Sequence, residues 1–144
     1  MIFRFVIYGL LGLALEVLWT SISAKLFRKE ESWSLKGTTY VWMFPIYGSV
    51  VFLYEPIMSL LTRLNLEWYY RGLIYTVGIF IIEYLTGYLL KRLFGKCPWD
   101  YTGARFQLHG FIRFDYAPLW FGLGLLLEPI SGYLTKISLP YQIF

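Results

Sequence analysis

Four glutamates lie within apolar stretches of the chain, and they are its first candidates for chemistry. They are Glu16, Glu55, Glu83 and Glu128. An ionisable group at the centre of a bilayer costs about 2.5 to 3.5 kcal/mol on insertion scales, so such residues face protein or a wet cavity and often carry protons or cations. The four acids therefore predict proton or cation sites. The alternative is that protonated glutamates only form hydrogen bonds that hold helices together.

A proline follows two of these acids directly. The stretches are FLYEPIMSLLTRL, residues 52–64, and LLLEPISGYLTKI, residues 125–137. Pro56 and Pro129 lack an N–H and their rings crowd the preceding turn, so we predict a helix kink beside each acid. A broken helix is tolerated at membrane depth only where it is buried in protein or lines water. A freed carbonyl oxygen beside a carboxylate is typical of a cation or proton site.

A second group of candidates lies between residues 95 and 116, and it is dense in charged and aromatic side chains. The candidates are Trp99, Asp100, Tyr101, Arg105, His109, Arg113 and Asp115. At a membrane interface they could bind a lipid headgroup or a phosphate, or act on one. Alternatively, Asp100 caps a turn and the rings anchor the loop.

Other kinds of chemistry find little support in the sequence. Cys97 and His109 have no third group at a recognisable catalytic spacing, so catalytic residues stay unassigned and we do not expect an enzyme. A single cysteine permits neither an intrachain disulfide nor a cysteine metal cluster. No glycine-rich phosphate loop is present, and no basic stripe accompanies a soluble module. We predict no cofactor, no metal and no nucleic-acid partner.

The elements that position these residues must be membrane helices. The chain has 144 residues, of which 58% are hydrophobic and 15% charged. Four stretches approach the roughly 20 residues that span a bilayer, at about 3–27, 41–62, 70–94 and 115–135. We predict an all-α, integral membrane four-helix protein forming a single transmembrane domain, 1–144, in the cell (plasma) membrane. The first span is long and carries Glu16, so we expect it to be retained.

Basic residues predict the orientation of the four spans. The loops after spans one and three carry nine, and the opposite side carries four. The nine are Lys25, Arg28, Lys29, Lys36, Lys91, Arg92, Lys96, Arg105 and Arg113, and the four are Arg4, Arg63, Arg71 and Lys136. Because cytoplasmic loops carry an excess of Lys and Arg, we expect loops one and three in the cytoplasm and both termini outside.

The chain also contains an internal repeat. Residues 35–64 align without gaps on 108–137, an offset of 73, with matched Gly, Pro, Glu and Thr positions. Spans one and three align at an offset of 67, which pairs Arg4, Tyr8 and Glu16 with Arg71, Tyr75 and Glu83. We predict two tandem helix-loop-helix hairpins, about 1–66 and 67–144. Each has an even number of spans, so the repeat is parallel.

Three segments carry a family resemblance: VWMFPIYG at 41–48, RGLIYTVGIFIIEYLTGYLLKRLFGKCPWDY at 71–101 and HGFIRFDYAPLWF at 109–121. With Glu16, they resemble the CmpB-type "putative ABC-transporter" permease family of small multi-pass membrane proteins and the related animal TMEM proteins. The resemblance covers nearly the whole chain. It implies a permease-like subunit, which would need an ATPase partner. Separately, LGLALEVLWTSISAK, residues 11–25, is similar to the first helix of small multidrug transporters.

We therefore expect a transporter or permease-like subunit that uses the four glutamates as proton or cation sites. Four helices barely enclose a pathway, so a homodimer or a heteromeric membrane complex is expected. Two alternatives stay open. One is an interfacial enzyme or lipid-binding protein acting through the loop of Trp99 to His109. The other is a structural or regulatory membrane subunit.

Overall fold

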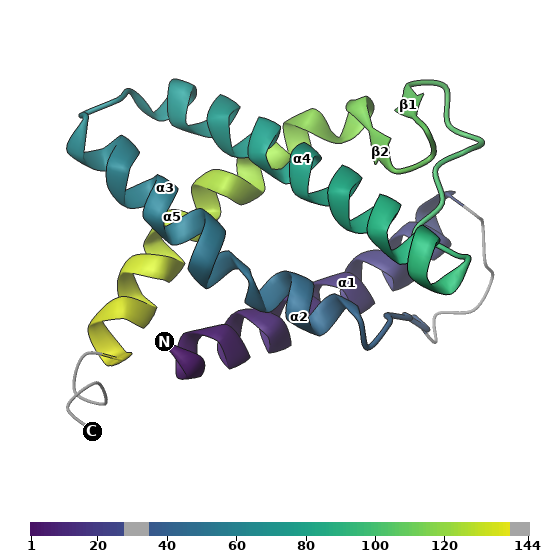
Figure 1. Ribbon diagram of the computed structural model, residues 1–144, viewed down its shortest axis with the longest axis horizontal. Coiled ribbons are helices and arrows are strands. Elements are labelled where there is room, and N and C mark those ends of the chain that lie inside the picture. Colours follow the sequence, from purple (N-terminus) through teal and green to yellow (C-terminus); the bar gives the residue numbers. More distant parts are fainter. Residues whose placement is uncertain (28–34, 139–144) are drawn as a thin grey trace. The chain divides into compact units, whose positions relative to one another are not determined.

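The computed structural model describes residues 1–27 and 35–138, and these are mostly helical (Figure 1). The elements are α1 (Ile2–Phe27), α2 (Met43–Gly48), α3 (Val50–Arg63), α4 (Trp68–Phe94), β1 (Gln107–Leu108), β2 (Ile112–Arg113), a 3-10 helix η1 (Phe114–Tyr116) and α5 (Ala117–Ser138). The all-α fold class is confirmed. Two of the basic residues used for orientation, Arg28 and Lys29, lie outside the described residues.

Three helical stretches are long and apolar enough to cross a membrane: Ile2–Leu26, Met43–Arg63 and Trp68–Phe94. They correspond to the first three predicted spans. Helix α5 forms over the fourth predicted span, 115–135, but it is not among these stretches in the part of the chain that the structure describes, so its crossing of the membrane stays a prediction. Two prolines, three glycines, Glu128 and Lys136 lower the hydropathy of α5.

The chain divides into two compact units. The first, here called the N-terminal unit, contains Met1–Pro56 and the chain from Leu134 onward; the second, the central unit, contains Ile57–Tyr133. Helices α3 and α5 each contribute residues to both units. In α3 the division falls directly after the Glu55–Pro56 pair.

In the N-terminal unit, α1 packs along α2 through close approaches of glycine to aromatic rings (Figure 1). A Cβ atom added to Gly12 would lie 2.2 Å from Cγ of Tyr47, and one added to Gly48 would lie 2.7 Å from the Phe5 ring. Both distances are shorter than any real van der Waals contact, so only glycine lets the rings lie there. The fit brings Glu16 and Glu55 next to side chains of other elements.

The second predicted span is interrupted at Ser49 rather than at its Glu-Pro pair. The Ser49 N–H donates to the carbonyl oxygens of Pro45 (3.0 Å) and Ile46 (3.2 Å), and its hydroxyl donates to Ile46 at 2.6 Å. This turn separates α2 from α3. Pro56 and Pro129 lie inside α3 and α5, which continue past them. A kink at either proline stays a prediction.

In the central unit, α4 packs against the first part of α5 and against the β1–β2 hairpin. A Cβ at Gly72 would lie 2.4 Å from the Phe121 ring, and one at Gly124 would lie 2.5 Å from Cβ of Tyr75. Helix α4 ends at Gly95, whose φ of 73° is the left-handed cap conformation that glycine adopts without strain. The chain then forms the antiparallel hairpin, which pairs Gln107 with Arg113 and Leu108 with Ile112.

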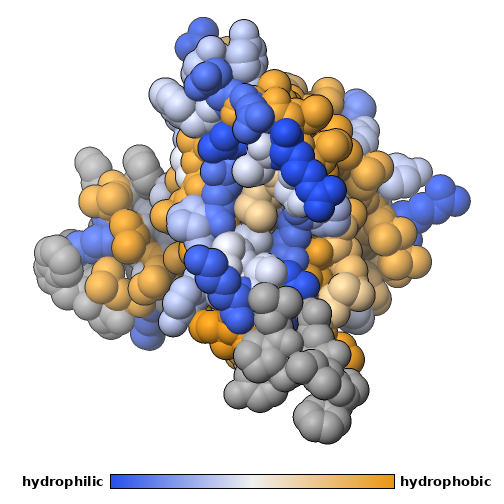
Figure 2. Space-filling model, turned by 90° about the vertical axis from the view of Figure 1, so that its left-hand side faces the viewer, coloured by the Kyte–Doolittle hydropathy of each residue, from blue (hydrophilic) through white to orange (hydrophobic). Residues whose placement is uncertain are grey.

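Many large apolar side chains lie on the surface of both units. Leu18 of α1 is 56% exposed and Leu85 of α4 is 59% exposed. Figure 2 shows broad hydrophobic areas on the face that it presents. Soluble proteins rarely expose large contiguous apolar surface, so these side chains suit contact with lipid.

Candidate functional site

Glu55 is held in the N-terminal unit by a cation and a hydroxyl group. Its Oε2 accepts from Nη1 of Arg4 at 2.5 Å, and its Oε1 accepts from the Tyr8 hydroxyl at 2.9 Å. Arg4 also donates to the Thr135 hydroxyl at 2.9 Å. The side chains of Arg4 and Glu55 are only 12% and 11% exposed. Glu55 therefore has a counter-charge where it is buried.

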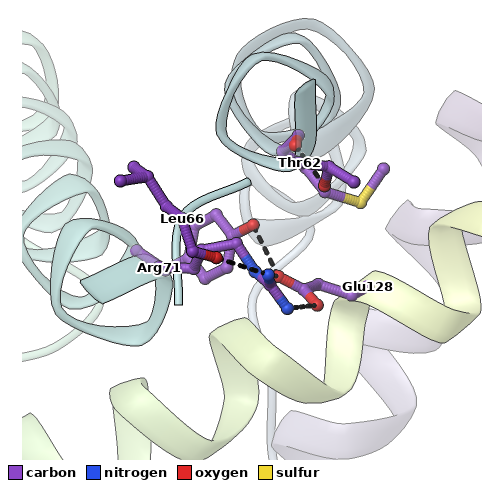
Figure 3. A network of polar contacts seen from close by, with 6 residues as sticks. Thr62, Leu66, Arg71 and Glu128 are labelled. Carbon is purple, nitrogen blue, oxygen red and sulfur yellow. Dashed lines mark hydrogen bonds and ion pairs between the residues drawn. The ribbon is translucent and has the colours of Figure 1, made fainter. Parts of the chain in front are cut away.

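Glu128 has the same kind of partners in the central unit (Figure 3). Arg71 binds it with two parallel hydrogen bonds, Nε to Oε1 at 2.7 Å and Nη2 to Oε2 at 3.0 Å, and Tyr75 donates to Oε1 at 2.8 Å. The third guanidinium nitrogen of Arg71 donates to the carbonyl oxygen of Leu66 at 2.8 Å. Two parallel hydrogen bonds of this kind fix the orientation of the two side chains and also strengthen the ion pair.

Sequence reasoning missed these arginines as partners of Glu55 and Glu128, because it used Arg4 and Arg71 only for orientation and as matched positions of the predicted repeat. The sequence did contain a pattern that could have pointed to these arginines. Arginine and tyrosine stand four residues apart in both α1 and α4, so both side chains lie on one helix face. The same pair recurs at the predicted offset of 67.

Glu16 lies beside neutral donors only, among the residues that the structure describes. Its Oε2 accepts from the Thr39 hydroxyl at 2.7 Å and from the Tyr47 hydroxyl at 3.0 Å. The three ion pairs found in residues 1–27 and 35–138 do not include it. Glu16 is thus hydrogen-bonded without a matching positive charge.

Glu83 differs from the other three acids. Its Oε2 atom is buried without a hydrogen-bond partner within the described chain, and so is Nε1 of Trp120. The Trp120 indole lies near this carboxyl group, but no hydrogen bond with good geometry joins the two side chains. In the predicted alignment, Trp120 corresponds to Tyr47 and Ile112 corresponds to Thr39. The central unit therefore lacks both hydroxyl groups that bind Glu16.

Within the loop, the predicted Asp100 and Asp115 make local contacts. Asp100 accepts from the backbone N–H of Thr102 at 2.9 Å and from the Thr102 hydroxyl, and these hydrogen bonds hold the pKa of Asp100 below its ordinary value of 3.8. Arg113 donates from Nε to Asp115 at 2.9 Å, which lowers the pKa of Asp115 and raises that of Arg113. The turn-capping alternative for Asp100 accounts for these contacts.

The other loop candidates also have separate partners. Nε1 of Trp99 donates to the carbonyl oxygen of Phe111 at 2.9 Å, and Nδ1 of His109 lies 2.8 Å from the Tyr84 hydroxyl. Arg113 stacks on the rings of Tyr116 and Tyr101, 4.4 and 5.9 Å from their centroids. The guanidinium carbon of Arg105 lies 5.3 Å from the Phe106 centroid. The structure thus brings most of these residues together as a folded loop, with no shared contact that resembles a catalytic group.

Comparison with known families adds to this geometry. Residues 3–139 match the family described as "Putative ABC-transporter type IV". The chain belongs to this family. The match covers nearly all of the chain, as the resemblance in the sequence implied. With its three membrane-capable helices, the family identifies a membrane protein connected with transport. No solved structure matches the chain.

Proposed function

We propose that the protein is a permease-like subunit of a transporter in the plasma membrane, in which Glu16 and Glu83 bind the proton or cation. The observation that carries the proposal is the Glu83 carboxyl group, which is buried beside Trp120 with one oxygen unpartnered in the described chain. A buried acceptor without a partner costs about 1 to 3 kcal/mol. A proton or a small cation on this carboxylate would remove that cost.

The other two acids have a different role in this proposal. Glu55 and Glu128 are neutralised by Arg4 and Arg71. Releasing either acid to carry a transported ion would leave a largely buried arginine without its counter-charge, which is unfavourable. We assign these two acids to holding the helices in place.

The proposed internal repeat is supported by contacts that recur in each unit. The Arg4–Glu55–Tyr8 cluster corresponds to Arg71–Glu128–Tyr75, which is described above. The Phe5–Gly48 contact corresponds to Gly72–Phe121, with the large and small partners exchanged. In both contacts one phenylalanine ring lies against one glycine, although the two residues have changed places between the helices. Two copies of one packing arrangement that have since diverged would show this pattern. We therefore retain two hairpins, about 1–66 and 67–144, within one transmembrane domain.

A third contact supports the same correspondence. Thr20 bonds to the backbone of Thr38 in the N-terminal unit, at 2.9 and 3.0 Å. The equivalent positions of the central unit are Gly87 and Phe111, where a Cβ on Gly87 would lie 3.0 Å from the Phe111 ring. The Thr20–Thr38 contact is a hydrogen bond and the Gly87–Phe111 contact is apolar, but the two contacts join equivalent positions of the proposed repeat.

An ATPase subunit is the partner that the family description suggests. This chain has no glycine-rich phosphate loop, so ATP hydrolysis would be supplied by another chain. We propose a heteromeric membrane complex, or a homodimer that binds such an ATPase. Purification in mild detergent followed by mass spectrometry would identify the partner.

The experiment that tests the glutamate role is proton flux in proteoliposomes, followed with a pH-sensitive dye. We expect Glu83→Gln to lower the flux at least tenfold and Glu16→Gln to lower it as well, because an amide cannot exchange a proton. The matched control is Glu67→Gln, an exposed acid before α4, which should leave the flux unchanged. Unchanged flux in the Glu16→Gln, Glu83→Gln double variant would reject this mechanism. Wild-type protein without flux would favour the structural-subunit alternative.

A further inference from the structure

A cavity of about 310 Å³ lies in the central unit, where α4 ends and the β1–β2 hairpin begins. Its lining includes Lys91, Lys96, Asp100, His109, Gly110 and Phe111. Two lysines and a histidine line it, against one acid. Gly110 suits its place in the lining, because its φ of 75° is left-handed and a Cβ there would lie 2.7 Å from the Thr102 hydroxyl.

The two lysines form no ion pair within the described chain, although the charge of Lys91 helps to lower the pKa of Asp100. None of the three ion pairs found there includes Lys91 or Lys96. Nζ of Lys91 lies 5.4 Å from the centroid of the Phe111 ring, so its contact is with an aromatic face. Asp100, the one acid of the lining, already accepts two hydrogen bonds from Thr102. The charges of this cavity therefore fit an anion.

A groove of about 720 Å³ adjoins the cavity and shares Lys91, His109 and Phe111 with it. Its other lining residues are Tyr84, Tyr88 and Arg92 of α4. The Tyr84 and Tyr88 rings pack edge-on against Phe111, with centroids 5.5 and 6.5 Å away. When the Tyr84 hydroxyl donates to Nδ1 of His109, the ring proton is on Nε2 and is available to another acceptor. The groove thus joins aromatic walls to basic groups.

An apolar stripe continues from this groove along α4. Val77, Ile81 and Leu85 follow one another at helical spacing and are 57%, 53% and 59% exposed. Tyr88 and Arg92 extend the same stripe to the end of the helix. One face of α4 therefore changes from aliphatic to aromatic to basic, which is the order of groups met from the middle of a bilayer to its surface.

We propose that this surface binds one anionic phospholipid, independently of the glutamate role proposed above. Lys91, Lys96 and His109 bind the phosphate of the headgroup in the cavity. One acyl chain lies in the groove and along the Val77–Ile81–Leu85 stripe. The carbonyl end of α4 alone would repel an anion, but Lys91 and Arg92 in its last turn offset that partial charge.

Native mass spectrometry of the purified protein tests the proposal, with phosphatidylglycerol and phosphatidylcholine of equal chain length as probes. We expect one phosphatidylglycerol to bind preferentially, and Lys91→Gln with Lys96→Gln to weaken it about tenfold or more, since each basic residue near a membrane surface contributes measurably. The control is Lys36→Gln with Lys136→Gln, which removes the same charge at exposed positions and should retain binding. Lys91→Arg with Lys96→Arg keeps the charge and should bind like the wild type.

Three results would overturn the proposal. One is equal binding of phosphatidylglycerol and phosphatidylcholine by the wild type. Another is equal weakening in the control and in the Lys91, Lys96 variant, which would indicate a general charge effect. The third is displacement of the bound lipid by inorganic phosphate, together with an equal rise of the thermal unfolding midpoint in phosphate and in lipid. That result would identify a site for soluble phosphate. Because Glu83 is unchanged in every variant, proton flux can persist whichever result is found.

Discussion

At the scale of single residues, the donors around each glutamate decide its role. Glu55 and Glu128 have an arginine and a tyrosine each, and Glu16 has two neutral hydroxyl groups. Glu83 has one unpartnered oxygen within the described chain. Burying a charge is unfavourable unless a counter-charge or hydrogen bonds replace water. Four similar acids therefore divide into two that are neutralised by arginine and two that are not.

Removal of one member of the Arg71–Glu128 ion pair should destabilise the protein more than removal of both members. We expect Arg71→Met to lower the free energy of unfolding by about 3 kcal/mol, at the low end for buried pairs because Arg71 and Glu128 are 22% and 21% exposed. The single variant leaves Glu128 without its cation. Arg71→Met with Glu128→Leu should recover most of the loss. Chemical unfolding in mixed micelles, followed by circular dichroism, measures both.

Arg63→Met is the control for the ion-pair prediction. Arg63 is exposed, and no ion pair found in the described residues includes it. Its replacement should change the free energy of unfolding by less than about 0.5 kcal/mol. If Arg71→Met proves as stable as Arg63→Met, the Arg71–Glu128 pair is not important for holding the helices.

At the scale of elements, glycine-to-ring contacts determine which helix faces meet. Phe5 of α1 lies against Gly48 of α2, whereas Gly72 of α4 lies against Phe121 of α5. Each contact lets backbone and ring approach more closely than a methyl group would allow. The close approach then places Arg4 near Glu55 in one unit and Arg71 near Glu128 in the other.

This exchange predicts that one unit can be converted to the arrangement of the other. We expect Gly48→Phe alone to destabilise the protein by about 1 to 3 kcal/mol or more, because its ring overlaps Phe5. Adding Phe5→Gly reproduces the Gly72–Phe121 arrangement and should restore most of the thermal unfolding midpoint.

The matched control for this exchange is Gly122→Ala in α5. A Cβ at Gly122 meets no atom within 4 Å, so this change should not lower the midpoint. Failure of the double variant to recover relative to Gly48→Phe would show that the two contacts are not equivalent. The proposed repeat would then lose its strongest support from packing.

At the scale of the whole molecule, the distribution of basic residues predicts the orientation in the membrane. The central unit ends α4 with Lys91 and Arg92, and the connection to the hairpin continues with Lys96. The short turn between α3 and α4 contains Asn65 and no basic residue after Arg63. This difference in charge favours a cytoplasmic side for the end of α4.

Labelling with a membrane-impermeant maleimide tests the orientation. In a Cys97→Ser background, we expect Asn65→Cys to react in intact cells and Lys96→Cys to react only after permeabilisation. Both positions are exposed and lie outside the helices, so accessibility from one side should decide the result. Reaction of Lys96→Cys in intact cells would reverse the predicted topology.

The sequence by itself located the helices. Apolar length located α1, α4 and the α2–α3 stretch to within a few residues, because a bilayer demands about 20 apolar residues whatever they pack against. The helix predicted at 115–135 also formed, as α5, but its prolines, glycines and charges reduce its hydropathy, so its crossing of the membrane stays a prediction. The predicted repeat aligned Arg4 and Tyr8 with Arg71 and Tyr75, but it did not indicate that either arginine binds a glutamate.

Only the tertiary structure decided what each acid contacts. Hydropathy treats Glu55 and Glu83 alike, since both interrupt an apolar run. A partner such as Arg4 lies 51 positions from Glu55, and a sequence pattern within one helix carries no information about such a contact. Neighbouring helices meet through rings and glycines, and that packing neutralises Glu55 and Glu128. It leaves Glu83 beside Trp120, with no hydroxyl donor among the described residues.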